Sequence, residues 1–364
     1  MTLHAKVADV ANIGNFTDKY FTRVRQALEF HKMNPMVTYR CFMRVDTRPI
    51  YRFVEEYLQA NVFEIGDYKF TPLAREGEFV HAKEPLFEIT GRFQGLVQHE
   101  TTILQRFGWA SLSCYNAARI RAAAPRPIVL IDMAARHAPG TDAATWASYA
   151  AHVGGFDVCS TDSGGATFGD AGKGTMPHAW VGLFPTTAEA AVAYAQAFPN
   201  EKISVLVDYY AQELDDAVAC YKAVGDRLAG VRIDTHGGRF CQGVTNTDAE
   251  GEFAAITRLR DDFGVDFAGQ HGSYAYGRGV TIEAAYVLRQ ALDRAGAKRV
   301  GITVSSGFSP EKVAAFTSCR APVTSIGTGS FLPVDMRDTY ATMDIVAYDN
   351  KPKIKVGREW LLKK

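Results

Sequence analysis

The chain has 364 residues, of which 47% are hydrophobic, and its 40 basic and 40 acidic side chains give a formal net charge of zero. Without a long basic run, the sequence excludes an extended nucleic-acid-binding surface. No apolar run approaches the ~20 residues that span a bilayer, and the chain opens without a secretory signal pattern, so we expect a cytoplasmic protein. The six cysteines are scattered without metal-ligand spacing, which predicts free buried thiols.

The first predicted element is a helix that begins at Thr17 or Asp18, since either side chain can cap its N-terminus. Apolar residues then recur at helical spacing, namely Phe21, Val24 and Leu28. A strand is predicted over residues 36–45, and a second helix over residues 53–59.

Residues 68–100 alternate short strands with turns, which resembles the small β-sandwich of biotinyl and lipoyl carriers. Such a carrier needs a modifiable lysine at a hairpin tip, and the candidate Lys83 lacks flanking methionines. We therefore expect a structural β-module, with a carrier as the alternative. A helix is predicted to follow over residues 101–124.

Beyond this helix, strand candidates alternate with segments of helical spacing such as 186–198 and 282–296. The strand candidates are 128–133, 156–161, 180–184, 203–210, 230–235, 265–269, 299–306 and 323–330. Roughly seven or eight strand–helix repeats predict parallel βαβ units in a closed or nearly closed α/β barrel.

The sequence therefore predicts an α/β fold with an incomplete or irregular α/β barrel and an amino-terminal β-rich, barrel-sandwich-like α+β domain. We expect domain boundaries at 1–125 for the amino-terminal domain and 126–335 for the barrel. Residues 336–364 are predicted to form a tail that packs back on the amino-terminal domain.

Polar residues gather where the barrel strands end, which is the edge where such folds place their chemistry. The glycine-rich stretch 154–180 lies between apolar flanks, as a loop between elements of the α/β body, and its backbone amides could approach an anion closely, which predicts a phosphorylated ligand. The polar residues at the predicted strand ends are Asp132, Arg136, Asp208, Asp234, Thr235, Arg239, Ser305-Ser306-Gly307 and Gly327-Thr328-Gly329.

Several short motifs resemble the nicotinate phosphoribosyltransferase family, closest to its shorter archaeal-type members. The motifs are TDKYF at 17–21, HETTIL at 99–104, DMAARH at 132–137, GTMPHA at 174–179, LVDYY at 206–210 and VRIDT at 231–235. The resemblance implies transfer of a phosphoribosyl group from phosphoribosyl pyrophosphate to nicotinate, which yields nicotinate mononucleotide and pyrophosphate. It also implies a homodimer or larger homo-oligomer with active sites shared between subunits.

Displacing pyrophosphate from the sugar passes through a state with positive charge on the ribose, so carboxylates are needed beside the sugar and cations beside the phosphates. Asp234 and Asp208 suit the ribose, and Asp234 also suits Mg²⁺. The resemblance assigns Arg232 and Arg239 to phosphoribosyl pyrophosphate. The alternative for each of the arginines, Arg136 included, is a surface or inter-subunit ion pair, and the alternative for Asp234 is helix capping at a strand end.

The resemblance assigns the remaining site residues by their motifs. The loops Ser305-Ser306-Gly307 and Gly327-Thr328-Gly329 would hold the 5′-phosphate, with simple turns as the alternative. His178 matches the histidine that family members phosphorylate when they couple ATP hydrolysis to the transfer; whether ATP is coupled stays open. The base would contact Tyr20 from a neighbouring subunit, Met133, Arg136 and Thr175.

Two departures from the family pattern leave the base open. The family has DFG where this chain has Asp132-Met133-Ala134, and THGGR at 235–239 replaces a segment with proline and serine. Met176 stands where nicotinamide-using relatives carry an acid, which favours nicotinate. The alternatives are a transferase for nicotinamide, quinolinate or another heteroaromatic base, and a non-catalytic paralogue that only binds a nucleotide.

Overall fold

The computed structural model describes residues 10–62, 68–265 and 272–362, and the chain divides into two compact units. Unit 1 comprises Met1–Asn116, Ala138–Gly154 and Pro333–Lys364. Unit 2 comprises Ala117–His137 and Gly155–Leu332. Residues 138–154, which the sequence placed inside the barrel domain, therefore group with unit 1.

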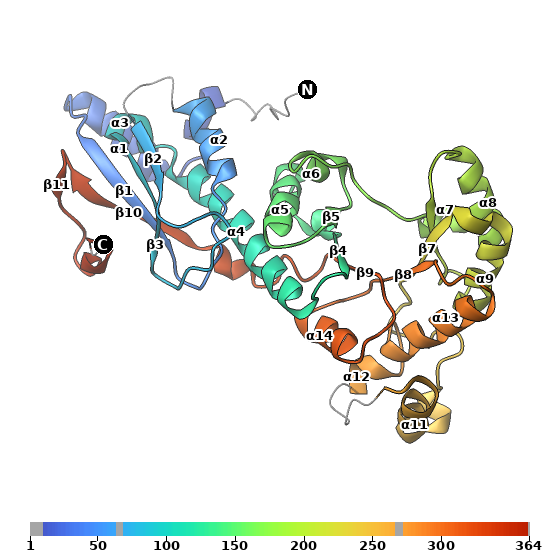
Figure 1. The fold of residues 1–364 in the computed structure, drawn as a ribbon. Helices are drawn as coiled ribbons and strands as arrows, with labels where there is room; N and C mark the ends of the chain where they lie inside the picture. The colour runs from blue at the N-terminus through green and yellow to red at the C-terminus, as the bar shows by residue number, and fades with distance from the viewer. Residues whose placement is uncertain (1–9, 63–67, 266–271, 363–364) are drawn as a thin grey trace. The chain divides into compact units, whose positions relative to one another are not determined.

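Unit 1 is built on a five-stranded antiparallel sheet with the order β11-β10-β1-β3-β2 (Figure 1). Its strands are β1 (Met36–Met43), β2 (Tyr68–Pro72), β3 (Pro85–Arg92), β10 (Ala341–Tyr348) and β11 (Lys351–Pro352). Strand β1 lies in the middle and pairs with β3 on one side and β10 on the other. The tail of the chain thus supplies two strands of this sheet.

The helices of unit 1 bury apolar side chains against this sheet. In its core, the ring of Tyr51 lies 6.0 Å from the ring centroids of both Phe87 and Phe107. The helical segments are η1 (Val10–Asn15), α1 (Lys19–Phe30), α2 (Arg52–Asn61), α3 (Phe93–Leu96), α4 (Glu100–Ala123, in unit 1 up to Asn116), α5 (Thr141–Val153), η5 (Met336–Thr339) and η6 (Glu359–Leu362).

Unit 2 contains a six-stranded, all-parallel sheet with the order β5-β4-β9-β8-β7-β6 (Figure 1). Its strands are β4 (Val129–Asp132), β5 (Val158–Cys159), β6 (Ile203–Leu206), β7 (Leu228–Ile233), β8 (Gly301–Val304) and β9 (Ser325–Thr328). Because every strand points the same way, all six carboxyl ends meet at one edge. The two sheets together confirm the predicted α/β fold class, with a curled, incomplete barrel in unit 2 and an antiparallel sheet in unit 1.

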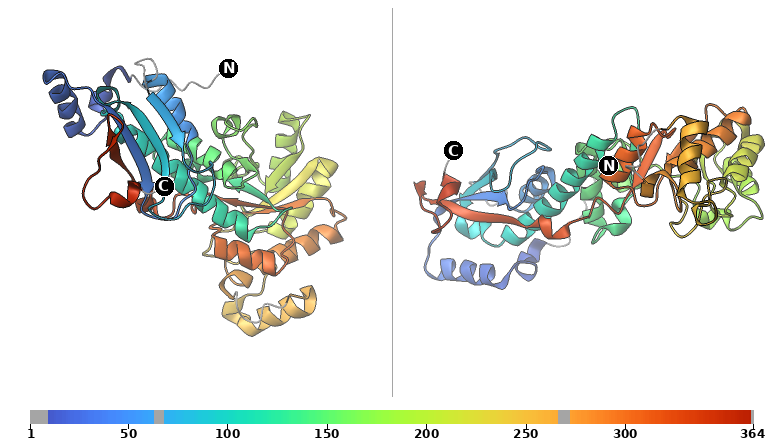
Figure 2. Two further views of the ribbon diagram at one scale, coloured as in Figure 1. Left: turned by 60° about the vertical axis from the view of Figure 1, so that its left-hand side comes forward. Right: turned by 90° about the horizontal axis from the view of Figure 1, so that it is seen from below.

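Helices flank the parallel sheet, and Figures 1 and 2 show α13 and α14 against one side of it. Helices α8, α9 and α13 pack in a row, with α9 against β7 and α13 against β8. The helical segments of unit 2 are η3 (Ala134–His137), α6 (Asp162–Ala166), α7 (His178–Val181), α8 (Thr187–Ala197), α9 (Glu213–Val224), η4 (Gly225–Arg227), α10 (Thr247–Glu250), α11 (Glu252–Phe263), α12 (Gly272–Ala275), α13 (Ile282–Arg294) and α14 (Pro310–Ser318).

The glycine-rich stretch contacts the two edge strands of this sheet. The amide of Lys173 donates to the carbonyl of Cys159 in β5 at 2.8 Å, and the amide of Met176 donates to the carbonyl of Ser204 in β6 at 2.9 Å. Met176 also forms a parallel bridge with Val205. The segment therefore connects the open edges of the incomplete barrel.

One predicted strand is wrong, and another lies outside the described residues. Residues 180–184 form the end of α7 and a turn, because the rings of Trp180 and Phe184, four residues apart, pack at 5.1 Å as on a helix. The predicted strand at 265–269 falls largely on residues that the structure does not describe. All six cysteines are free and buried, as predicted. Among the described helices, none is long and apolar enough to cross a membrane.

Candidate active site

A hydrogen-bonded cluster lies where β7 and β8 end. Arg232 donates from Nη2 to Oδ2 of Asp234 at 2.7 Å and from Nε to Oγ of Ser305 at 2.9 Å. Ser305 in turn donates to Oδ1 of Asp234 at 2.7 Å, which closes a ring of three side chains. The parallel register places Ile233 beside Val304, so the residues that follow them meet. Two predicted phosphate-binding residues and the predicted catalytic carboxylate therefore lie together.

Thr175 joins this cluster from the glycine-rich stretch. Its Oγ1 accepts a hydrogen bond from Nη1 of Arg232 at 3.1 Å. The bridge between Met176 and Val205 holds Thr175 beside the sheet edge. The guanidinium of Arg232 is thus fixed by three oxygen acceptors, which a planar five-donor group can satisfy together.

His178 and Asp208 form a second pair, after β6. Nε2 of His178 lies 3.2 Å from Oδ2 of Asp208. Asp208 is buried, and burial raises the pKa of its carboxyl group, while the contact with His178 opposes that rise. The other oxygen, Oδ1, is buried without a hydrogen-bond partner among the described residues. Since His178 itself is exposed, Asp208 holds one ring nitrogen and leaves the other accessible.

Arg239 supports this pair from the side. It donates from Nη2 to the backbone carbonyl of Asp208 at 2.6 Å and forms an ion pair with the buried carboxylate of Glu213, also at 2.6 Å. Glu213 also accepts from the hydroxyl of Thr235 at 2.9 Å. The guanidinium of Arg239 therefore contacts two groups of the protein itself, the carbonyl of Asp208 and the carboxylate of Glu213. The contact of Arg239 with phosphoribosyl pyrophosphate stays a prediction.

The loop after β8 has an unusual backbone. Ser306 and Gly307 both have positive φ, at 79° and 69°, which is uncommon for a serine. The carbonyl of Ser306 accepts a hydrogen bond from Nζ of Lys312 at 3.0 Å. Lys312 is buried, and burial lowers the pKa of its amine to about 8. The loop that the sequence predicted to bind phosphate is therefore anchored by a hydrogen bond from the buried Lys312.

Gly327, near the end of β9, and Gly329, directly after the strand, have a packing role that the sequence did not indicate. A Cβ atom at Gly327 would lie 2.4 Å from Cε of Met133, and one at Gly329 would lie 2.4 Å from the carbonyl oxygen of Met133. The hydroxyl of Thr328 donates to the carbonyl of Phe308 at 2.7 Å. Met133 thus packs directly on this strand end, and the predicted phosphate contact of the loop stays untested.

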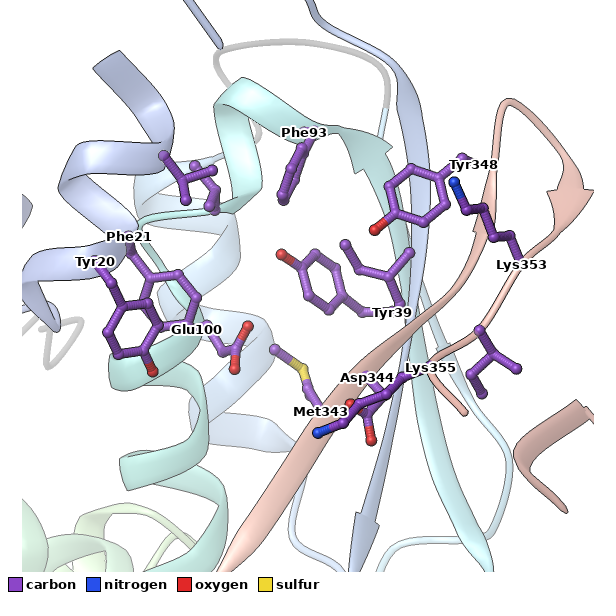
Figure 3. A pocket seen from close by; sticks show the side chains of 14 residues that line it. Tyr20, Phe21, Tyr39, Phe93, Glu100, Met343, Asp344, Tyr348, Lys353 and Lys355 are labelled. Atoms are coloured by element: carbon purple, nitrogen blue, oxygen red, sulfur yellow. The ribbon is translucent and has the colours of Figure 1, made fainter. Parts of the chain in front are cut away.

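Two predicted base-binding residues have no hydrogen bond to this network among the described residues. Arg136 is exposed on η3, shortly after Met133. Tyr20 belongs to unit 1, where 59% of its surface is exposed and its ring packs on Phe21 with centroids 4.2 Å apart. Tyr20 lines a pocket of about 420 Å³ together with side chains that include Tyr39 and Glu100 (Figure 3).

Sequence reasoning missed Glu213 and Lys312. Glu213 is the first residue of α9 and Lys312 lies in the first turn of α14, positions where acidic and basic residues ordinarily face solvent. Both are buried here and bond to the site's backbone or side chains. The available signal was weak: each follows a predicted strand end within a few residues.

No group of three or more His, Cys, Asp or Glu side chains in the described part of the chain could by itself hold a metal ion. That finding does not conflict with magnesium, since Mg²⁺ usually takes only one or two protein carboxylates besides substrate phosphates. Both oxygens of Asp234 already accept a hydrogen bond, whereas Oδ1 of Asp208 has no partner among the described residues. The assignment of Asp234 to a metal stays a prediction.

Comparison with known proteins identifies the relatives of this chain. No protein-family model matches it. Over 317 residues it is 27% identical to the nicotinate phosphoribosyltransferase pncB2 of Mycobacterium tuberculosis, a match covering 85% of this chain and 58% of the relative. The chain is a relative of the nicotinate phosphoribosyltransferases. It spans less than two thirds of the length of the curated relatives that it matches over most of its own length.

Solved structures support the fold of this nicotinate phosphoribosyltransferase relative. The nicotinate-nucleotide pyrophosphorylase of Pyrococcus furiosus superposes with a TM-score of 0.73 at 24% identity, covering 96% of this chain and 80% of the other. Human nicotinic acid phosphoribosyltransferase superposes with a TM-score of 0.64 at 20% identity, covering 94% and 76%. At these identities the likeness establishes the fold, and the family resemblance predicted from the motifs is confirmed by the sequence match.

Proposed function

We propose that this protein transfers the phosphoribosyl group of phosphoribosyl pyrophosphate to nicotinate, giving nicotinate mononucleotide and pyrophosphate. The observation that carries the proposal is the meeting of Arg232, Asp234 and Ser305 beside the pair His178–Asp208 at the carboxyl edge of the parallel sheet. The sequence match to nicotinate phosphoribosyltransferases supports the same reaction.

In this proposal the carboxylates act on the sugar. The bond from C1 of the ribose to the pyrophosphate oxygen breaks while the ring nitrogen of the base attacks C1, so positive charge develops on the sugar. Asp234 is fixed by Arg232 and Ser305, and Asp208 by His178, so neither carboxylate has to reorient as the charge forms. Such preorganised charge is worth the most where it costs no rearrangement.

The cations and amides act on the phosphates. Hydrogen bonds to Thr175 and Ser305 orient the guanidinium of Arg232, whose delocalised positive charge would face the leaving pyrophosphate. The loop of Ser306 and Gly307, with positive φ at both residues, turns successive backbone groups toward a 5′-phosphate. The loop at 327–329 is the second candidate for this phosphate.

The base is the least constrained substrate. Met133 can cover an aromatic face with its polarizable sulfur, and Arg136 can pair with a carboxylate on the ring. Tyr20 would close the other face from a neighbouring subunit of a homo-oligomer. Because Met176 supplies no acidic group, a carboxylated base meets no repulsion there.

His178 is proposed to couple ATP to the transfer. When Nε2 carries the proton, it donates to Asp208, and the lone pair of Nδ1 is free to accept a phosphoryl group. Magnesium would be held by Asp234 or Asp208 together with substrate phosphates, and would neutralise charge on the leaving pyrophosphate. An enzyme that acts on small-molecule substrates in this way would be expected in the cytoplasm.

The test is product formation, followed by mass spectrometry. The full chain is incubated with phosphoribosyl pyrophosphate, Mg²⁺ and an equimolar mixture of nicotinate, nicotinamide and quinolinate, with and without ATP. We expect nicotinate mononucleotide, and we expect His178→Ala to abolish any stimulation by ATP. Formation of a different mononucleotide would show that the substrate base is nicotinamide or quinolinate and not nicotinate. Tight nucleotide binding without turnover would indicate a non-catalytic paralogue.

A further inference from the structure

Unit 1 contains a cavity that holds none of the residues predicted for phosphoribosyl transfer. Its volume is about 500 Å³, within the ~300–1,000 Å³ typical of small-molecule sites. It lies between the first half of α4 and the start of α5, with η5 at one side. The lining residues are Leu104, Gln105, Arg106, Trp109, Pro139, Gly140, Thr141, Asp142, Ala143, Trp146, Met336 and Thr339.

Arg106 is a buried cation in this lining, with only 9% of its surface exposed. Its guanidinium carbon lies 5.0 Å from the ring centroid of Tyr57 and 4.6 Å from that of Trp146. In the part of the chain that the structure describes, Arg106 forms no ion pair or hydrogen bond, and its Nε is buried without a partner. A buried charge in this condition is costly, and aromatic faces offset only part of the cost.

The start of α5 adds a second feature that favours an anion. This helix runs for 13 residues from Thr141, and none of the side chains that the structure describes caps its first turn. Gly140, which precedes the helix, has a φ of 130°. The first helical hydrogen bond runs from the amide of Ala144 to the carbonyl of Gly140 at 3.0 Å. The earlier amides of the helix and its dipole therefore favour a negative group.

The two features belong to one site. Trp146, whose ring stacks on the guanidinium of Arg106, lies on α5 one turn beyond Asp142, and both residues line the same cavity. Asp142 is the one acidic side chain among the described lining residues, and its charge partly opposes the effect of burial, which lowers the pKa of Arg106. Two features of the site therefore favour an anion, the guanidinium of Arg106 and the start of α5, and one feature, the carboxylate of Asp142, disfavours it.

We propose that this cavity is a second ligand site, which binds a small organic anion through a carboxylate or phosphate group. The anionic group would sit between the guanidinium of Arg106 and the free amides at the start of α5. The body of the ligand would contact Leu104, Trp109 and Met336. This inference does not depend on the proposed phosphoribosyl transfer, because no residue is shared.

Tryptophan fluorescence tests the site directly. The chain has four tryptophans, and Trp109 and Trp146 both line the cavity. A variant with Trp180→Phe and Trp360→Phe keeps only these two reporters. It is titrated with inorganic phosphate, benzoate and the uncharged analogue benzamide. We expect a saturable change with benzoate, phosphate or both, and none with benzamide; binding of benzoate alone would select the carboxylate.

Two substitutions in this reporter background keep the helix and change the charge of its first turn. Thr141→Glu places a carboxylate in the first turn of α5, where it favours the helix dipole and competes with the ligand; we expect at least tenfold weaker binding. Asp142→Asn removes the opposing charge, and we expect severalfold tighter binding. Arg106→Gln should abolish the response, with circular dichroism as the check on its folding.

Three outcomes would overturn the proposal. One is the absence of any saturable change with phosphate or benzoate. Another is equal binding of benzamide, which would make the site apolar. The third is a response that persists unchanged in Thr141→Glu and Asp142→Asn, which would place the bound anion elsewhere in the molecule, for instance at the parallel sheet.

Discussion

Nε2 of His178 lies 3.2 Å from Oδ2 of Asp208, and the second oxygen of that carboxylate is buried with no partner among the described residues. The pair joins a residue of the glycine-rich stretch to the end of β6. A carboxylate that orients one nitrogen of an imidazole fixes which nitrogen is available for chemistry. Asp208 is therefore a positioning residue for His178 as well as a candidate for the ribose.

Replacing Asp208 with asparagine tests that relationship. Asp208→Asn keeps the shape but removes the charge, and we expect kcat for nicotinate mononucleotide formation to fall by about 10²-fold or more, the range of positioned acid–base groups. Any stimulation by ATP should be lost as well. Asp216→Asn is the matched control, because Asp216 is also a buried carboxylate, bonded to Thr187 at 2.5 Å in α8 rather than to a site residue. Equal losses in both variants would contradict the assignment.

Arg232 should govern binding of phosphoribosyl pyrophosphate. Arg232→Lys keeps the charge but cannot reach Thr175, Asp234 and Ser305 together, and each lost charge-assisted bond costs ~1.5–3 kcal/mol. We expect the KM for phosphoribosyl pyrophosphate to rise tenfold or more, with a smaller change in the KM for the base. Arg227→Lys is the control, since among the described residues Arg227 bonds to the backbone carbonyls of Phe198 and Glu201 and to no side chain. An unchanged KM would assign Arg232 a structural role.

Much of this fold follows from the sequence, and the exceptions have physical reasons. Strand-end residues such as Asp208, Asp234 and Ser305 were predicted, because each follows an apolar run and the end of that run indicates where the strand ends. Lys312 and Glu213 were not, because a charged residue in a first helical turn ordinarily faces solvent and only the tertiary contacts bury it. Residues 180–184 were mistaken for a strand, since a short apolar run has no period that separates strand from helix.

The glycines at 327 and 329, which the sequence assigned to a loop and which lie at the end of β9, illustrate a different limit. In the sequence, a glycine that makes room for a ligand and a glycine that makes room for the protein are indistinguishable. The close approach of Met133 to Gly327 and Gly329 became visible only in three dimensions. Likewise, the burial of Arg106 between the rings of Tyr57 on α2 and Trp146 on α5 depends on residues that no local pattern brings together.

Glu100 should make the stability of the protein depend on pH. Burial, with added repulsion from Asp344 and Asp18, raises the pKa of Glu100 to about 8 in the folded state. The folded state therefore binds the proton more tightly than the unfolded state, so stability is greatest below the unfolded pKa and is lost as pH rises toward 8. We expect Glu100→Gln to raise the free energy of unfolding at pH 8.5 by about 1–3 kcal/mol, and by little at pH 4.5.

Urea unfolding at several pH values measures this difference. Glu29→Gln is the control, because Glu29 is exposed on α1 and forms an ion pair with Arg25 on the same helix. We expect its effect to be small and constant across the same pH range. A Glu100→Gln variant whose stability difference from the wild type does not change between pH 4.5 and 8.5 would show that Glu100 titrates as an ordinary carboxylate.

Lys312 should show the opposite sign. Burial lowers the pKa of its amine from 10.5 to about 8, so the unfolded state binds the proton more tightly and stability rises with pH between about 8 and 10.5. We expect Lys312→Met to flatten that rise, measured as the difference in unfolding free energy from the wild type. It should also raise the KM for phosphoribosyl pyrophosphate, because the carbonyl of Ser306 loses its donor. The control Lys222→Met, near the end of α9, should change neither quantity.

The two glycines beside Met133 predict a contrast between substitutions two residues apart. In Gly327→Ala the new methyl group meets the flexible end of the Met133 side chain, at 2.4 Å from Cε and 2.8 Å from Sδ. In Gly329→Ala it meets the backbone, at 2.4 Å from the carbonyl oxygen of Met133. A side-chain end can move and a strand end cannot, so we expect Gly329→Ala to cost more than the ~1–3 kcal/mol typical of overpacking. Met133→Ala should restore the stability of Gly327→Ala but not of Gly329→Ala, which thermal unfolding of the single and double variants measures. Equal rescue of both would mean that the backbone at Met133 yields as readily as its side chain.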